Sequence, residues 1–446
     1  MASKALDFEH GNVYSLFYKL LIPTLVGTLT MAAVTTIDGI FIGQGVGAAG
    51  VAAVNIAVPI YQIMGGVYLM IAVGCSVVAS IHVSQKDIVL ARVKITQALL
   101  FTVFVAALIN IIGFSFPHQV AKLLGASETL MPQVVDYMVW VLPSFLFQVW
   151  AGVGLFVIRL DGAPRYAMWC NVIPATLNAF LDWLFIFPLG MGVKGAAIAT
   201  SISMSFGGLM AMAYLFFFAK DLKVISIDIS GRGFISWARN IAYQCKIGSS
   251  TLLGELTLAV LIYVGNLTFM KYLGDTGVGA FGIACYYMPF FFMIGNAVAQ
   301  SAQPIISYNY GIGRWKEIKM ASGLMYVTSL VMGVIVTLLF IFIPDKLVAL
   351  FVDTHSDAGV VAINGFPYLA VGIISFILNV SVIGYYQSIE QVKSATLFVC
   401  LRGFLFLIPC FILLPQFLHI RGIWLAMPMA ELLTMLVIIG KTLLRR

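Results

Sequence analysis

The chain has 446 residues, of which 61% are hydrophobic and only 10% are charged. A soluble domain has about 25% charged residues, so this composition excludes a soluble globular protein. The net charge of +7 could suit a nucleic-acid partner, but the basic residues gather in short segments between apolar blocks. That arrangement is typical of an integral membrane protein, and we expect the lipid bilayer rather than nucleic acid as its surroundings.

Twelve apolar blocks follow one another along the chain, each long enough to cross a hydrocarbon layer of roughly 30 Å as a helix. The blocks are continuously apolar and do not alternate with period two, which favours helices over the strands of a barrel. The predicted fold is therefore an all-α membrane protein. The blocks cover residues 20–43, 54–82, 95–116, 133–157, 167–189, 195–219, 247–271, 282–308, 320–343, 361–386, 395–415 and 422–440.

The positions of Lys and Arg predict the topology. Most of them fall in connections that a twelve-helix chain places on the same side as both termini, so the positive-inside rule predicts cytoplasmic termini. The first block follows a polar segment and is long enough to span, so we expect it to stay as a helix. No Walker sequence, metal-binding motif or catalytic motif is visible, and we expect no cofactor, no structural metal and no enzyme activity.

The longest polar connection divides the chain into two halves of six helices. We predict an N-lobe at 1–219, a cytoplasmic linker at 220–246 and a C-lobe at 247–446. The halves repeat each other, since VGAAGVAAVNIAVP, ending at Pro59, aligns without gaps with TGVGAFGIACYYMP, ending at Pro289. A parallel repeat of this kind suits two lobes that alternate access to a central cavity, although a duplicated channel or enzyme is an alternative.

Two aspartates interrupt apolar helices in the first half. Asp38 in helix 1 and Asp182 in helix 5 each lie about 15 residues beyond the inner helix end, which is a depth of roughly 22 Å. Asn178 is one turn from Asp182, and Thr200 and Tyr137 reach the same layer. An Asp in the bilayer costs roughly 2.5–3.5 kcal/mol and usually marks an ion or proton pathway. These five residues are the predicted H⁺ or Na⁺ coupling site, with structural aspartates as the alternative.

Polar residues in the second half form a weaker set of candidates. Glu255 in helix 7 could attract a cationic substrate or form a second ion site. Glu431 in helix 12 could do the same or could pair with Arg402. Gln300 and Gln303 at the end of helix 8 could line a cavity or a cytoplasmic gate, or serve only in helix packing.

The chain resembles the multidrug and toxic compound extrusion (MATE) transporters. The resemblance rests on TTIDGIFIGQGVGAAGVAAVNIAVP in the first half and AQSAQPIISYNYGIGRWKEIK in the second, and it covers essentially the whole chain. It is nearest in pattern to the DinF/MepA-like branch of the family. The resemblance implies two pseudo-symmetric six-helix bundles in a bacterial inner membrane. It further implies export of organic cations or amphipathic drugs in exchange for H⁺ or Na⁺.

The resemblance also implies roles for particular residues. The five residues named for the coupling site match the family's N-lobe cation site, where Na⁺ would bind Asp38, Asp182, Asn178 and Thr200. Pro23 matches a proline at which helix 1 bends, and Glu255 matches an acid that many relatives carry. Helix 10 has no carboxylate, and Asn379 is its nearest polar residue, which weakens a C-lobe Na⁺ site.

Other functions compete with the multidrug exporter. A lipid-linked oligosaccharide flippase of the same superfamily would more naturally have fourteen helices and a basic cavity. A membrane enzyme would need a nucleophile with a base, or a metal constellation, and neither is visible. The sequence does not exclude a passive channel, and it does not decide between H⁺ and Na⁺ as the coupling ion. The sequence indicates no protein partner.

Overall fold

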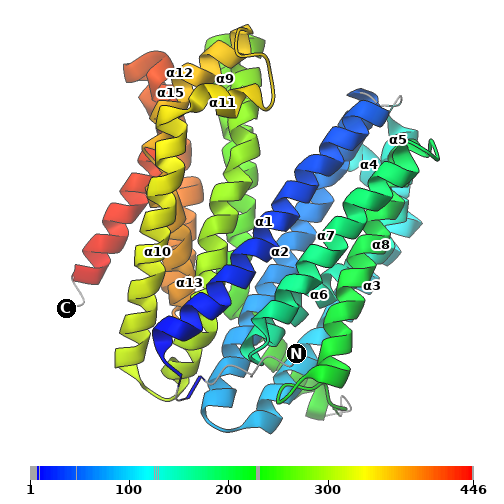
Figure 1. Ribbon diagram of the computed structural model, residues 1–446, viewed down its shortest axis with the longest axis vertical. Coiled ribbons are helices and arrows are strands. Elements are labelled where there is room, and N and C mark those ends of the chain that lie inside the picture. The colour runs from blue at the N-terminus through cyan, green and yellow to red at the C-terminus, as the bar shows by residue number, and fades with distance from the viewer. Residues whose placement is uncertain are drawn as a thin grey trace. The chain divides into compact units, whose positions relative to one another are not determined.

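The computed structural model describes residues 8–9, 11–46, 48–124, 126, 128, 130–227 and 232–443. Across these ranges all regular structure is helical and no strand occurs (Figure 1). The predicted all-α fold is confirmed. The α-helices are α1 (Val13–Gly45), α2 (Ala48–Ser84), α3 (Ile88–Ser115), α4 (Pro117–Leu123), α5 (Met131–Val141), α6 (Phe145–Leu160), α7 (Pro164–Ile186), α8 (Gly192–Ala213), α9 (Arg232–Gly311), α10 (Trp315–Phe342), α11 (Pro344–Ala349), α12 (Asp357–Ala370), α13 (Ile373–Ser388), α14 (Val392–Cys400) and α15 (Leu407–Leu443). The 3-10 helix η1 (Leu142–Ser144) and the π-helices η2 (Tyr214–Phe218) and η3 (Leu401–Leu405) join some of them.

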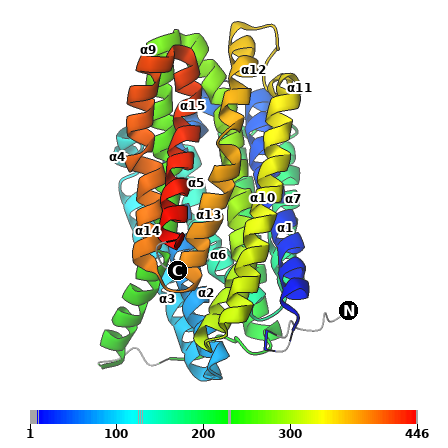
Figure 2. The ribbon, with the colours of Figure 1, turned by 90° about the vertical axis from the view of Figure 1, so that its left-hand side faces the viewer.

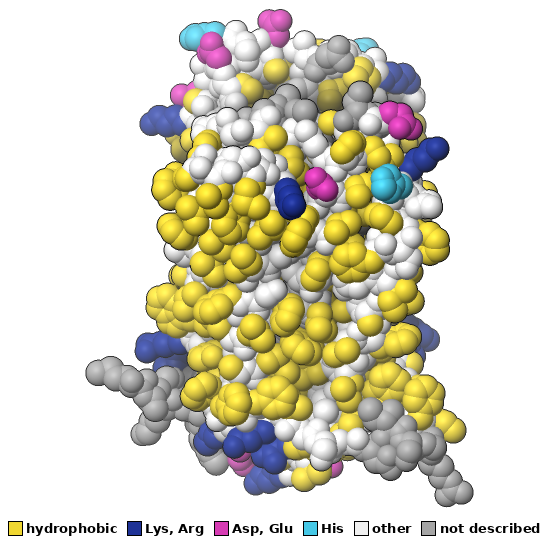
Figure 3. Space-filling view, turned by 90° about the vertical axis from the view of Figure 1, so that its right-hand side faces the viewer, with side chains coloured by type: hydrophobic (Ala, Val, Ile, Leu, Met, Phe, Trp, Pro, Cys, Tyr) yellow, Lys and Arg dark blue, Asp and Glu magenta, His cyan; other side chains and the backbone are white. Residues whose placement is uncertain are grey.

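The helices are long and apolar enough to cross a membrane repeatedly. Ten spans occur in the described part of the chain, or eleven when the pair α12 and α13, bent by 53°, counts as one span. One of the ten, Val392–Lys441, is itself two helices that meet at His419, where φ is 51°. Counting the bent pair as one span and dividing Val392–Lys441 at His419 gives the predicted number of twelve spans. Figure 3 shows an apolar band across one face, with Lys and Arg side chains mainly beyond it at both ends.

The seventh span begins earlier than the apolar pattern predicts. Its helix starts at Arg232, whereas the apolar block starts at 247, because polar residues in between resemble a loop. In the structure these residues are paired. Asn240 Nδ2 donates to Gln97 Oε1 of α3 (3.0 Å), and Gln244 Nε2 donates to the Lys94 carbonyl (3.3 Å).

The chain folds into two compact units. Unit 1 comprises Met1–Leu252 with Ser307–Trp315, and unit 2 comprises Leu253–Ile306 with Lys316–Arg446. The chain therefore enters unit 2 inside α9, returns briefly to unit 1 at the end of α9, and enters unit 2 again. Figure 2 shows α10, α13, α14 and α15 of unit 2 running lengthwise side by side.

The internal repeat extends to the backbone conformation of the turns. Non-glycine residues with positive φ are uncommon, yet such residues occur here at positions where the other half also has positive φ. The matched pairs, separated by 227 or 228 positions, are Lys86 with Gly313, Gly162 with Glu390, and Gly192 with His419. The same turns therefore end corresponding helices in both halves.

The interiors of the two units are packed with different kinds of side chain. In unit 1 small residues allow close helix contact, as at Gly154 of α6, which packs on Ala211 of α8. In unit 2 aromatic rings fill the core: Phe269 stacks on Phe281 with centroids 4.5 Å apart and meets Trp424 edge-on at 4.9 Å.

Candidate functional site

The two intramembrane aspartates of the first half meet in unit 1. Helices α1 and α7 pack along each other, and Phe41 meets Phe187 edge to face at 5.8 Å. Gly27 of α1 rests on the α7 helix. This packing brings the Asp38 and Asp182 carboxyl groups within hydrogen-bonding reach of each other. Asp182 is completely buried and Asp38 is partly buried, so the pair is an internal site and not two separate surface groups.

Among the described residues, no basic side chain forms an ion pair with Asp38 or Asp182. Neither oxygen of Asp182 accepts a hydrogen bond, nor does the buried Oδ1 of Asp38, from any other described residue. The ion pairs found among the described residues involve other side chains. Two adjacent carboxylates repel strongly in a low-dielectric interior. A proton shared between them would relieve that repulsion, and so would a cation such as Na⁺, for which oxygen atoms without donors are suitable ligands.

The remaining predicted members of the coupling site lie on α5, α7 and α8. Asn178 lies one helical turn from Asp182 on α7, and its buried Nδ2 has no hydrogen-bond partner among the residues described. Thr200 is buried on α8, and Tyr137 is buried in an apolar cluster formed largely by α2, α5 and α8. Coupling roles for these three residues stay predictions.

Helix α1 continues through the predicted bending point. Pro23 lies inside α1 and is buried. Next to it, Thr24 is 2% exposed and its Oγ1 has no partner in the described structure. A proline in a helix removes one backbone hydrogen bond. The bend itself stays a prediction.

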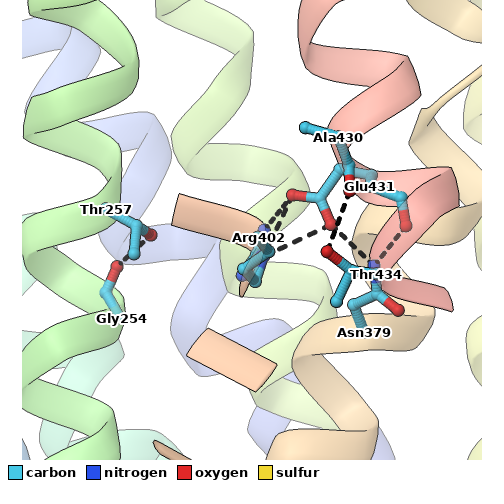
Figure 4. A network of polar contacts seen from close by, with 7 residues as sticks. All are labelled: Gly254, Thr257, Asn379, Arg402, Ala430, Glu431 and Thr434. Atoms are coloured by element: carbon cyan, nitrogen blue, oxygen red, sulfur yellow. Dashed lines mark hydrogen bonds and ion pairs between the residues drawn. The ribbon is translucent and has the colours of Figure 1, made fainter. Parts of the chain in front are cut away.

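A second buried charged group lies in unit 2, and it is fully paired (Figure 4). Arg402, in the π-helix η3, donates to Glu431 through Nη2 to Oε1 (2.7 Å) and through Nε to Oε1 (3.0 Å). Asn379 Nδ2 donates to Glu431 Oε2 (2.7 Å) and to the Glu431 carbonyl (2.9 Å). The Arg402 guanidinium also lies 4.3 Å from the centre of the Phe376 ring. The suggested pairing of Glu431 with Arg402 is confirmed. Asn379, a candidate for substrate binding, lies against Glu431.

The two acidic sites therefore differ in kind. Glu431 has a counter-ion and an amide donor, so it is neutralised without any ligand. Asp38 and Asp182 have only each other among the described residues. Among the described residues, Glu431 therefore has a counter-ion and the acid pair of unit 1 has none.

The other candidates of the second half lie on α9. Glu255 is half-buried, next to Gly254, whose carbonyl accepts a hydrogen bond from Thr257 Oγ1 (2.7 Å). Gln303 is buried and Gln300 is partly buried. Ion or substrate binding by these residues stays a prediction.

Sequence reasoning missed Asp161, a buried acid at the turn between α6 and α7. Its carboxylate accepts hydrogen bonds from Tyr214 Oη (2.8 Å) and from the backbone N–H groups of Lys220 (2.8 Å), Asp221 (3.0 Å) and Leu222 (2.9 Å). The start of the inter-lobe connection is thereby fastened to unit 1. The Asp-Gly sequence signals only a turn, and nothing local indicates its distant partners.

A two-unit, many-span helical protein with an unneutralised acid pair in one unit fits the class of membrane transporters. The chain belongs to the MatE family, whose family model matches residues 23–184 and 252–412. The two matched stretches fall in the two repeated halves. The resemblance inferred from sequence motifs is therefore confirmed.

Individual relatives agree with this assignment. The multidrug export protein MepA of Staphylococcus aureus is 23% identical over 430 residues, covering 95% of this chain and 92% of MepA. An FAD transporter of Shewanella oneidensis is 25% identical over 334 residues, covering 74% and 72% of the two chains. The structure of the MATE multidrug transporter DinF-BH in complex with the dye rhodamine 6G superposes with a TM-score of 0.87 and 25% identity, over 99% of this chain and 97% of that one. These relatives are transporters and not enzymes, and they do not favour a flippase.

Proposed function

We propose that this protein is a secondary active multidrug exporter of a bacterial plasma membrane. It exchanges organic cations or amphipathic compounds for H⁺, with Na⁺ as the alternative ion, by alternating access of its two units. Both termini lie in the cytoplasm. The observation that carries the proposal is the contact between Asp38 and Asp182, two intramembrane acids without a counter-ion among the described residues.

Competition for this pair explains how exchange would work. The paired carboxylates are stabilised by a proton, by a metal cation or by an organic cation, but their charge limits how many of these bind together. A ligand drives a conformational exchange only through different affinities for the two states. Ion uptake at Asp38 and Asp182 would therefore displace a cationic substrate and favour the return of the carrier.

Two of the similar transporters support the substrate class. MepA is a multidrug export protein, and the DinF-BH structure holds the rhodamine dye. The FAD transporter indicates that a flavin nucleotide is the substrate of at least one similar protein. The rhodamine dye and FAD are therefore the two probes that separate these substrate classes.

The test uses purified protein in liposomes with a pH gradient and a Na⁺ gradient imposed separately. We expect the rhodamine dye to move against its gradient under one of the two, and Asp38→Asn and Asp182→Asn each to lower this uptake at least tenfold. Asp136→Asn, which changes an exposed acid on α5, is the matched control and should leave uptake unchanged.

Three outcomes would each contradict a part of the proposal. Full gradient-driven uptake by Asp38→Asn would show that the acid pair does not couple transport. Equilibration of the dye that responds to neither gradient would indicate a passive channel. Gradient-driven movement of FAD but not of the dye would replace the substrate class while leaving the coupling site intact.

A further inference from the structure

A small cluster of residues closes one end of unit 1. It joins the segment before α1, the turn between α2 and α3, and the end of α9, three parts that are far apart in sequence. The predicted topology places this end in the cytoplasm. We call this cluster the latch; its members are Phe8, Glu9, Ser84, Gln85, Lys86, Tyr308, Gly311 and Arg314.

The segment before α1 contacts both the turn after α2 and the end of α9. Arg314 Nη1 donates a hydrogen bond to the Glu9 carbonyl (2.7 Å), and Lys86 Nζ lies 3.5 Å from Glu9 Oε1. The ring of Phe8 lies 6.0 Å from that of Tyr308, centre to centre. Both Phe8 and Tyr308 are buried.

The end of α9 also meets α2 directly, through a glycine. A Cβ atom on Gly311 would overlap Ser84 Oγ and would lie 3.0 Å from the Ile81 carbonyl oxygen. Gln85 Nε2 lies 3.5 Å from the Gly311 carbonyl, at the limit of a hydrogen bond. A side chain at position 311 would therefore require the Ser84 hydroxyl to move and would press on the Ile81 backbone.

The connectivity of the chain gives these contacts a consequence. Ser307–Trp315 packs with unit 1, but the residues before and after it, up to Ile306 and from Lys316, belong to unit 2. Any motion of unit 2 relative to unit 1 therefore pulls on this segment at both of its ends. Either the segment leaves unit 1 or α9 bends next to Pro304.

We propose that the latch opens whenever the transporter opens to the cytoplasm, and that Gly311 sets how tightly it closes. This inference rests on the alternating access proposed above. The contacts suit a reversible closure because an exposed ion pair and a hydrogen bond to a neutral carbonyl are individually weak. Asp161, in contrast, fastens the connection after α8 with four hydrogen bonds, and we expect that part to stay closed.

The experiment measures access to the inside of the latch. Ser80 lies one turn from Ser84 on α2 and is completely buried. In protein whose six native cysteines are replaced, Ser80→Cys reports opening by its rate of reaction with a membrane-impermeant maleimide from the cytoplasmic side. We expect Gly311→Ala to raise this rate about tenfold, the effect of losing one or two weak contacts. Gly323→Ala is the matched control, because no atom lies within 4 Å of its added Cβ.

Further variants separate a specific effect from misfolding. Ser84→Ala removes the Oγ atom that the Gly311→Ala methyl would overlap, so the double variant should return towards the control rate. Arg314→Gln adds no bulk and weakens the contact with Glu9, so it should also speed labelling. Equal rates for Gly311→Ala, Arg314→Gln and Gly323→Ala would overturn the latch.

The same reporter separates failure of the latch from failure of the proposed function. With no substitution in the latch, labelling of Ser80→Cys should respond to the ion gradient and to the rhodamine dye. If it does not respond, alternating access is wrong. If it responds but Gly311→Ala behaves like the control, only the latch is wrong.

Discussion

Replacing Arg402 by Leu should destabilise unit 2 far more than replacing Arg402 and Glu431 together. Arg402 and Glu431 are 3% and 5% exposed at their side chains and form a bidentate pair. Without Arg402, the Glu431 carboxylate keeps only the Asn379 amide as a side-chain donor among the described residues. Breaking a buried pair on one side costs about 3–5 kcal/mol, because a charge is left without compensation.

The double variant provides the comparison. Replacing both members of a buried ion pair by apolar residues of similar volume is often neutral or even stabilising. Arg402→Met with Glu431→Leu should therefore stay within about 1 kcal/mol of the unchanged protein, since Phe376 and the helices around it can pack on the methionine. The coupling between the two sites should be several kcal/mol.

Thermal unfolding of the purified protein in detergent measures both effects. For a body of 150–250 residues, 1 kcal/mol corresponds to about 2–4 °C in Tm. The Arg402→Leu variant should therefore melt about 6–20 °C lower, and the double variant within about 4 °C of the unchanged protein. Apparent Tm values must be compared at one heating rate, because unfolding of such proteins is often irreversible. If the double variant melts at least as low as the single one, the pair is not the electrostatic unit that its geometry indicates.

Two further predictions concern packing and the fastened connection. Asp161→Ala removes the acceptor of four hydrogen bonds, and we expect trypsin to cleave after Lys220 about tenfold faster. Tyr214→Phe loses only one of the four, at about 0.5–1.5 kcal/mol, and should have a small effect on the cleavage rate. An unchanged cleavage rate in Asp161→Ala would show that the hydrogen bonds of Asp161 do not hold this connection on unit 1. Gly365→Ala places a methyl group inside the Trp424 ring and should lower the stability of unit 2 by about 1–3 kcal/mol, measured as a lower Tm. Gly282→Ala, with open space around it, is the control.

Sequence patterns were sufficient for the class of protein and for the unusual residues. Long apolar blocks can form only helices in lipid, because every backbone group must be satisfied within its own segment. An acid in such a block is costly enough to stand out, and so the sequence alone singles out Asp38, Asp182, Glu255 and Glu431. The depth of each acid also follows from the constant rise of the helix.

Boundaries of helices were less predictable where polar residues are buried. The stretch before residue 247 resembles a loop because Asn240 and Gln244 are polar. Their hydrogen bonds to α3 satisfy them inside the fold. A sequence pattern registers the polarity of a side chain but not a partner that lies more than a hundred residues away.

Composition and the apolar pattern are enough to establish a many-span helical membrane protein with a few intramembrane charges at known depths. Which of those charges meet depends on tertiary packing. Depth along a helix is fixed by local geometry, but the direction that a side chain faces depends on how neighbouring helices pack. The packing of α1 on α7 sets Asp38 against Asp182 with no counter-ion among the described residues, whereas the packing around η3 gives Glu431 an arginine. Under the proposed function, that difference makes the acid pair of unit 1 the site of the exchangeable ion, while the pair of Glu431 with Arg402 is part of the fold.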